Sequence, residues 1–262
     1  MHLLTSEILD QRQVAPDHWV TTLDAPAIAR AVRPGQFVML RPTEAFDPLL
    51  PRAFSVYHAD REAGCLAILY RAVGRGTRSL AALEAGRFVS VWGPLGKPFP
   101  LPATRHAILV GGGVGVPPLV YLAEELASAP LRRVALIGAA TGTLLLGTEF
   151  LRRAGAEIRL ATDDGSLGHA GYVTDLLPAA LREAEEATVY ACGPIPMLAA
   201  TARICREAGA RAYLAVEAPM ACGVGACLGC TVPRADGGFA RVCVEGPVFT
   251  ADQLDWAALT QP

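Results

Sequence analysis

Lysine is almost absent from this chain of 262 residues, in which Lys97 is the only one. The other basic residues are arginines, and the formal net charge is −2. This balance excludes the strong excess of positive charge with which many proteins bind DNA or RNA. Hydrophobic residues make up 52% of the chain and charged residues 18%, a composition that excludes an intrinsically disordered protein.

An uninterrupted hydrophobic run long enough to cross a membrane is also missing. The longest uncharged stretch, residues 106–123, approaches the length of a span, but glycines and prolines interrupt its middle. We interpret it as a strand, a turn and the start of a helix, and we expect no membrane span. The first residues lack the basic segment and long apolar run of a secretory signal peptide.

The cysteines lack the features of a disulfide framework, because there are seven of them and no secretory signal is evident. In a reducing cytoplasm, clustered thiols are more often a metal site than a set of disulfides. We therefore expect a cytoplasmic protein that binds a metal through cysteine.

Four cysteines near the C-terminal end have a distinctive spacing. The pattern is C-x4-C-x2-C followed, after twelve intervening residues, by one more cysteine, and it comprises Cys222, Cys227, Cys230 and Cys243. This is the spacing of plant-type [2Fe–2S] ferredoxins. The intervening glycines permit the unusual backbone conformations that a loop around a cluster needs. Zinc is the main alternative, since it also selects thiolates, and four unrelated buried cysteines are the other.

The pattern of strand, helix and turn signals along the chain predicts three parts, which we place at residues 1–102, 103–212 and 213–262. The first part has short β-rich runs separated by turns and predicts an antiparallel β-barrel with one short helix over 76–85. Its expected strands are 19–23, 36–40, 53–57, 65–70 and 88–92. The second part alternates strands with helices and predicts a doubly wound α/β domain with a parallel sheet. Its expected strands are 107–110, 133–137, 157–160 and 188–191. The third part is the small cysteine-bearing tail.

Two segments of the first part have side chains suited to a flavin nucleotide. Arg52, Ala53, Phe54 and Ser55 combine a guanidinium for a pyrophosphate, an aromatic ring and a hydroxyl for the edge of a flavin ring. On its own this segment equally fits a surface arginine and a core phenylalanine. A second segment ends a strand and reaches a helix N-terminus, where backbone N–H groups favour phosphate. Its candidate residues are Leu69, Tyr70, Arg71, Gly76 and Thr77.

The second part has two candidate segments at the carboxyl ends of its strands, where open α/β sheets bind ligands. The first is the glycine turn with Gly111, Gly112, Gly113 and Gly115. It is not the G-x-G-x-x-G fingerprint, and tight strand–helix packing is its alternative explanation. The second is Cys192, Gly193 and Pro194, and residues 162–168 follow another strand at the same edge.

Taken together, these motifs resemble the ferredoxin-reductase-like family over nearly the full chain. They are most similar to the electron-transfer subunits of the two-subunit, NAD-linked bacterial dihydroorotate dehydrogenases. Residues 52–55 match the family's R-x-[YF]-S motif for FAD, with Phe54 in place of tyrosine as a departure. Residues 69–71 and 76–77 match its L-Y-R and G-T elements, residues 111–115 and 192–194 its pyridine-nucleotide side, and the four tail cysteines its [2Fe–2S] ligands.

The resemblance implies an electron conduit rather than a site for dihydroorotate. It implies that FAD exchanges hydride with NAD and single electrons with the [2Fe–2S] cluster, which reaches the FMN of a catalytic partner subunit in a heterotetramer. It places no catalytic residue for dihydroorotate in this chain. Two alternatives remain. One is a subunit of another flavin and iron–sulfur oxidoreductase of the ferredoxin:NADP, sulfide or hydrogenase type, and the other is a zinc-stabilised binding module without redox activity.

Overall fold

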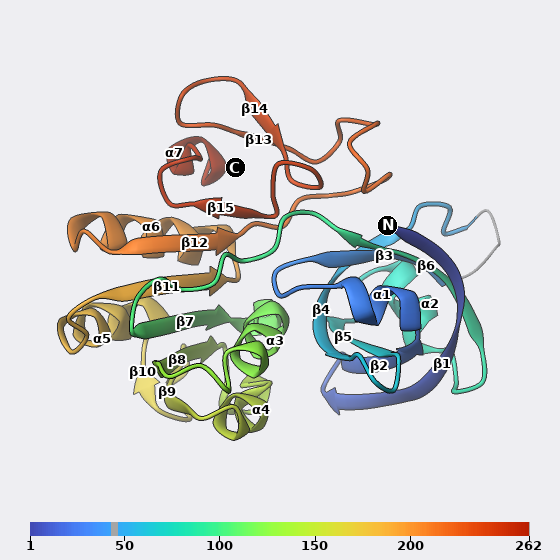
Figure 1. The fold of residues 1–262 in the computed structure, drawn as a ribbon, viewed down its shortest axis with the longest axis horizontal. Coiled ribbons are helices and arrows are strands. Elements are labelled where there is room, and N and C mark those ends of the chain that lie inside the picture. The colour runs from blue at the N-terminus through green and yellow to red at the C-terminus, as the bar shows by residue number, and fades with distance from the viewer. Residues whose placement is uncertain (43–46, 262) are drawn as a thin grey trace.

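The structure is a computed structural model that describes residues 1–42 and 47–261 (Figure 1). Its first part is a closed antiparallel barrel with the strand order β1-β2-β5-β4-β3-β6. The strands are β1 (His2–Ala15), β2 (His18–Asp24), β3 (Phe37–Arg41), β4 (Arg52–Asp60), β5 (Cys65–Arg71) and β6 (Phe88–Leu95). Two short helices, α1 (Pro26–Ala31) and α2 (Arg75–Ala81), accompany them. The predicted barrel is therefore confirmed.

The barrel contains one strand that the sequence did not reveal. The five predicted runs all overlap β2 to β6, but β1 was not anticipated. Only Ser6 and Ile8 of β1 are buried, so the strand lacks the alternation of apolar and polar residues by which strands are recognised. Its pairing with β2 also shifts register between Ile8 and Asp10, which interrupts the pattern further.

The second part is a sheet with the strand order β10-β9-β8-β7-β11-β12-β15. Its strands are β7 (His106–Gly112), β8 (Arg132–Ala139), β9 (Ala156–Thr162), β10 (His169–Ala170), β11 (Ala187–Cys192), β12 (Arg211–Ala215) and β15 (Val248–Thr250). All neighbours pair in parallel except β12 and β15, which are antiparallel. The sheet therefore extends beyond the predicted range of 103–212, because β12, which was not among the expected strands, runs to Ala215 and the tail returns to add β15 at the edge.

Helices cover both faces of this sheet, namely α3 (Pro117–Glu125), α4 (Thr148–Arg153), α5 (Leu177–Arg182) and α6 (Ile195–Glu207). Side chains of the central strand β7 divide between two hydrophobic cores, with Ile108 and Val110 in one and Ala107 and Leu109 in the other. A strand buried on both faces in this way reads as a continuous apolar run, which explains why residues 107–110 were recognisable.

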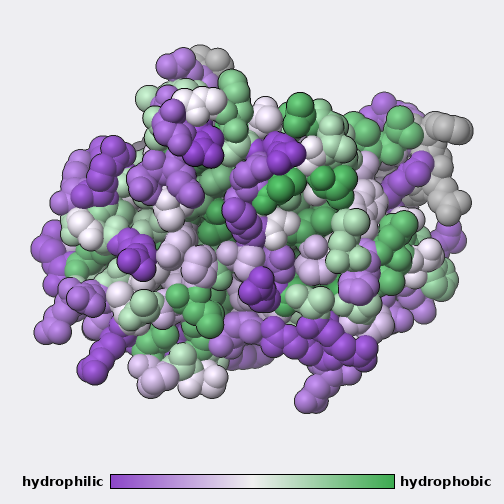
Figure 2. All heavy atoms as spheres, turned by 45° about the horizontal axis from the view of Figure 1, so that its top comes forward, coloured by the Kyte–Doolittle hydropathy of each residue, from purple (hydrophilic) through white to green (hydrophobic). Residues whose placement is uncertain are grey.

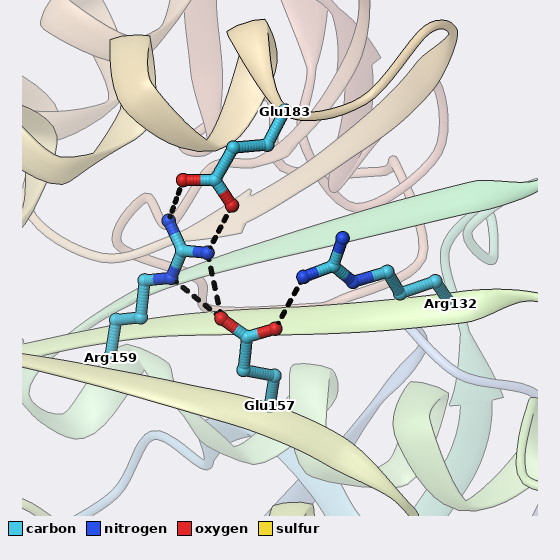
Figure 3. Close-up of polar contacts among 4 residues, drawn as sticks. All are labelled: Arg132, Glu157, Arg159 and Glu183. Carbon is cyan, nitrogen blue, oxygen red and sulfur yellow. Dashed lines mark hydrogen bonds and ion pairs between the residues drawn. The ribbon is translucent and has the colours of Figure 1, made fainter.

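An ion-pair network ties the edge of the sheet to a helix (Figure 3). Glu157 of β9 accepts hydrogen bonds from Arg132 Nη2 of β8 at 2.6 Å and from Arg159 Nε at 2.9 Å. Arg159 also holds Glu183 at the end of α5, with an Nη1–Oε1 distance of 3.0 Å. These side chains are partly exposed to water, so the network fixes the edge without adding much stability.

The tail contains β13 (Thr231–Pro233), β14 (Phe239–Arg241) and α7 (Trp256–Leu259). In Figure 1 it lies across the top of both the barrel and the sheet. Main-chain contacts tie it to the barrel, where the Lys97 N–H donates to the Gly246 oxygen at 2.6 Å. In the part of the chain that the structure describes, no helix is long and apolar enough to span a membrane.

Candidate functional site

The four tail cysteines lie in two pairs. The Sγ atoms of Cys230 and Cys243 are 3.2 Å apart, and both residues are buried. Cys222 and Cys227 form the outer pair, in which the Cys227 N–H points at Cys222 Sγ at 3.4 Å and the Cys227 side chain is exposed. Among the described residues, no three His, Cys, Asp or Glu side chains converge on one metal ion.

Two pairs of thiols suit a binuclear cluster better than a single ion. In a [2Fe–2S] cluster held by four cysteines, each iron takes two thiolates, whereas structural zinc gathers four ligands around one centre. The sequence pattern left zinc open, and the pairing of the sulfurs now favours the cluster.

The backbone of the loop is shaped around the outer sulfur. Gly223 and Gly225 have φ values of +70° and +81°, in the region that favours glycine. The Val224 N–H, like that of Cys227, points at Cys222 Sγ at 3.4 Å. Burial raises the pKa of the Cys222 thiol, but these N–H groups outweigh it and bring the pKa down to about 6. The loop thus stabilises a thiolate, the form that binds metal.

The cluster loop rests directly on the barrel. A Cβ atom on Gly223 would lie 2.6 Å from Met39 Cγ and 3.2 Å from Leu95 Cδ1, so the loop backbone contacts β3 and β6 closely. Met39 pairs with Ala53 of β4, the second residue of the R-A-F-S segment. Because directly paired residues of neighbouring strands share a face, the cluster loop lies over the face of the barrel to which Ala53 also belongs.

The structure brings Arg52 and Gly76 together. A Cβ on Gly76 would lie 2.2 Å from Arg52 Cζ, so the guanidinium lies directly against the first turn of α2. Thr77 accepts from the Gly74 N–H at 3.0 Å and thereby fixes the start of the helix. A guanidinium over a helix N-terminus is an arrangement that can hold a pyrophosphate.

The other residues of the two candidate flavin segments lie either inside the barrel or on its outer face. Phe54 and Tyr70 lie inside the barrel with ring centroids 5.3 Å apart, and the Tyr70 hydroxyl accepts from Gln11 Nε2 at 3.2 Å. The two rings and the side chain of Leu69 are buried and pack in the described structure. Ala53 and Ser55 are half-buried on β4, and Arg71 lines a cleft between the barrel and the sheet.

The glycine turn and the Cys192 segment meet at the carboxyl edge of the sheet. Gly111 is opposite Cys192 in the β7–β11 ladder, and a Cβ on Gly115 would lie 2.6 Å from the Cys192 oxygen. A Cβ on Gly112 would likewise lie 3.0 Å from Pro194 Cδ. The glycines therefore allow two loops to approach each other, as tight packing predicts, and they also leave backbone exposed to a ligand.

Two neighbouring clefts open at this edge. One of about 380 Å³ faces the barrel and the other, of about 590 Å³, extends over the sheet. Both are lined by the segments that contain Gly112, Gly113 and Pro194, so together they form an elongated site suited to a dinucleotide.

Several residues that line the two clefts do not belong to the motifs by which the sequence predicts a binding site. Glu217 and His18 line the first cleft, and Asp163 and Tyr172 line the second. Burial raises the pKa of the Glu217 carboxyl even though its surface opens into the cleft. Burial also raises the pKa of the Cys192 thiol, and the negative charge of Glu217 adds to the effect. The position of Glu217, two residues beyond the end of β12, could have indicated a role in binding, since ligands bind beyond strand ends in such sheets.

Several known proteins are similar to this chain in sequence or in structure. The family described as the iron–sulfur cluster binding domain of dihydroorotate dehydrogenase B matches residues 217–255, which include all four tail cysteines. The dihydroorotate dehydrogenase B (NAD(+)) electron transfer subunit of Geobacillus kaustophilus (strain HTA426) is 42% identical over 252 residues, covering 94% of this chain and 96% of that protein.

A second relative with the same name, from Desulforamulus reducens (strain ATCC BAA-1160 / DSM 100696 / MI-1), is 39% identical and covers 96% of this chain and 97% of its own length. Among solved structures, a chain from the NADH-dependent reduced ferredoxin-NADP oxidoreductase superposes with a TM-score of 0.88 at 29% identity. It covers 98% of this chain and 92% of its own.

Proposed function

Because the chain belongs to the family of dihydroorotate dehydrogenase B electron transfer subunits, we propose that it carries electrons between a dihydroorotate-oxidising partner subunit and NAD. The path runs through a [2Fe–2S] cluster and FAD, and the process belongs to pyrimidine biosynthesis. The resemblance given by the sequence motifs supports the same assignment.

The contact between the cluster loop and the barrel is the observation that carries this proposal. Gly223 lies beside the first cluster cysteine and touches Met39, and Met39 pairs with Ala53 of the candidate flavin segment. Met39, Ala53, Cys230 and Cys243 also belong to one hydrophobic cluster. Such a packed path keeps the two electron carriers close.

A flavin can exchange both a hydride and single electrons, so it links a nicotinamide to a one-electron cluster. On this chain, Arg52 and the start of α2 with Gly76 and Thr77 hold the FAD pyrophosphate, and Ser55 binds near the ring edge. The four cysteines bind the cluster, with Cys222 and Cys227 on its outer side. We assign residues 1–102, 103–212 and 213–262 to FAD, NAD and the cluster.

NAD occupies the elongated site at the carboxyl edge of the sheet in this proposal. The glycine turn and residues 192–194 allow the dinucleotide to approach the backbone, and the cleft beside Arg71 and Glu217 leads toward the barrel. Glu217 lines this cleft, and the buried Cys192 ends β11 directly before Gly193, which also lines it.

The partner subunit docks over the outer cysteines. The side chains of Val224, Leu228 and Val244, which are 45%, 59% and 38% exposed, belong to the loop and the turn that contain the exposed Cys227 and the buried Cys243. Figure 2 shows hydrophobic surface on the side where the tail meets the barrel. An apolar rim around an electron carrier suits a partner that must exclude water and shorten the gap. Seven free thiols suit a cytoplasmic location.

A ferredoxin:NADP type of oxidoreductase subunit is the second candidate, because the solved relative with a TM-score of 0.88 comes from such an enzyme. The two candidates differ in the partner that the cluster serves.

The test is to purify the chain anaerobically from cells that also express a candidate FMN subunit. We expect a complex that contains FAD, FMN, iron and sulfide and that reduces NAD with dihydroorotate. Cys227→Ser abolishes this activity and the visible absorption of the cluster, while FAD stays bound and NADH still reduces it. Zinc in place of iron, or loss of FAD from the variant, would contradict the proposal.

A further inference from the structure

An ion pair in the tail links the two segments that carry the cluster cysteines. Arg241 and Glu245 flank Cys243, the fourth cysteine of the pattern. Their side chains meet twice, with Arg241 Nε donating to Glu245 Oε2 at 3.1 Å and Arg241 Nη2 donating to Oε1 at 2.5 Å.

The backbone N–H groups of the same two residues also donate hydrogen bonds that close the turn around Cys243. The Arg241 N–H donates to Glu245 Oε2 at 2.7 Å, and the Glu245 N–H donates to the Arg241 oxygen at 2.9 Å. Cys243 therefore lies in the middle of a turn that is held from both ends.

The remaining arm of Arg241 reaches the other cysteine segment. Its Nη1 donates to the Gly225 oxygen at 3.2 Å, within the loop between Cys222 and Cys227. A Cβ on Gly225 would lie 2.6 Å from Val244 Cγ2 and 3.2 Å from Arg241 Nη1, so the loop packs against this turn without space for a side chain. One guanidinium thus holds together ligand segments that are distant in the sequence.

We propose that the Arg241–Glu245 pair positions the cluster loop and sets the reduction potential of the cluster. The proposal rests on the assignment of the [2Fe–2S] cluster to these four cysteines. Net charge and hydrogen bonding around the sulfurs are among the factors that fix cluster potentials. The two side chains are 36% and 34% exposed, so water screens their charges only in part.

The two charges act on the cluster with opposite signs. A nearby positive charge stabilises the reduced cluster, which has one more electron, and a nearby negative charge destabilises it. Arg241→Gln leaves the Glu245 carboxylate alone and lowers the midpoint potential. Glu245→Gln leaves the guanidinium alone and raises it. We expect each change to alter the reduction equilibrium about tenfold, which is about 59 mV for a one-electron couple.

The double variant separates charge from position. Arg241→Gln with Glu245→Gln removes both charges, so the midpoint potential returns close to the wild-type value, but the bond to Gly225 is still lost. We expect Arg241→Gln and the double variant to lose their clusters to an iron chelator several times faster than the wild type. Arg234→Gln is the matched control, because Arg234 pairs with Asp236 at 2.7 Å in an exposed turn of the same tail.

The measurement is a redox titration of the purified complex followed by visible absorption and electron paramagnetic resonance, with chelator release in parallel. Opposite shifts of the two single variants, with an unchanged Arg234→Gln control, support the proposal. Shifts of the same sign, or none, overturn it while the wild-type cluster remains. A wild-type chain without a cluster overturns both this inference and the proposed function.

Discussion

At the scale of single residues, we expect Asp163 to favour NADH over NADPH. Asp163 follows β9 and lines the 590 Å³ cleft over the sheet. Acidic groups near strand ends bind the ribose hydroxyls of NAD, and their charge opposes the 2′-phosphate of NADP. We expect Asp163→Asn to lower the KM for NADPH about tenfold, equivalent to about 1.4 kcal/mol. Steady-state rates of flavin reduction with NADH and with NADPH give the two KM values.

Asp164 supplies the matched control for this substitution. Its carboxylate accepts from the Ser166 hydroxyl at 2.6 Å and from the Ser166 N–H at 3.0 Å. Asp164→Asn therefore changes the net charge equally, with little effect on nucleotide choice. Equal effects of both substitutions on the KM for NADPH would show that overall charge decides, not the position of Asp163.

Residues of the candidate site could be predicted from the sequence where spacing alone determines the chemistry. The tail cysteines follow a fixed pattern, and so the pattern alone predicts that they are metal ligands. Glu217 and His18 belong to no such pattern, because they become neighbours only when β2 and the segment after β12 meet at the cleft. Phe54 matches a motif, and the structure adds its contact with Tyr70 inside the barrel, which the motif does not contain.

At the scale of elements, local periodicity predicted the barrel strands β2 to β6 and the alternation of strands and helices. It missed β1, which is mostly exposed, and the return of the tail as β15, which is three residues long. Short edge strands are determined by tertiary contacts rather than by their own sequence. The contact of the cluster loop with the barrel could not be predicted for the same reason.

Gly223 tests that contact between the cluster loop and the barrel. Its φ of +70° and the predicted approach of a Cβ to Met39 Cγ at 2.6 Å both oppose a side chain. We expect Gly223→Ala to slow electron transfer from FAD to the cluster and to reduce the iron content, while NADH reduces the flavin at an unchanged rate. Stopped-flow absorption follows both steps.

Gly237→Ala serves as the control for backbone strain. Gly237 has a φ of +91°, and no described atom lies within 4 Å of its Cβ position. Both substitutions therefore cost about 1–2 kcal/mol in backbone conformation. If Gly237→Ala slowed electron transfer as much as Gly223→Ala, the effect would come from general destabilisation of the tail and not from the contact with β3.

At the scale of the whole molecule, helix α3 joins the nucleotide sheet to the barrel. Tyr121 of α3 is buried, and its hydroxyl donates to the Val32 oxygen at 3.1 Å. Arg61 Nη2 lies 2.8 Å from Glu125 Oε1, and His58 Nδ1 lies 2.7 Å from Glu124 Oε2. These contacts hold the sheet against the barrel and so determine the shape of the cleft between them. The residues that make the contacts do not themselves line that cleft.

The His58–Glu124 pair makes this interface sensitive to pH. The hydrogen bond to Glu124 raises the pKa of His58 above its ordinary value of 6.5, although burial opposes the shift. The His58–Glu124 pair therefore contributes fully to the free energy of unfolding below about pH 6.5. This contribution is lost as the pH rises through the raised pKa of His58. We expect the free energy of unfolding to fall by up to about 1 kcal/mol between roughly pH 6 and 8, since His58 is 45% exposed.

Glu124→Gln removes this pH dependence because the neutral amide no longer favours the protonated imidazole. Urea unfolding of the wild type and the variant at the two pH values measures the difference. Arg61→Gln is the control, since it removes the neighbouring ion pair without adding or removing a group that titrates in this range. A Glu124→Gln variant that keeps the wild-type dependence would place its origin outside the interface between the barrel and the sheet.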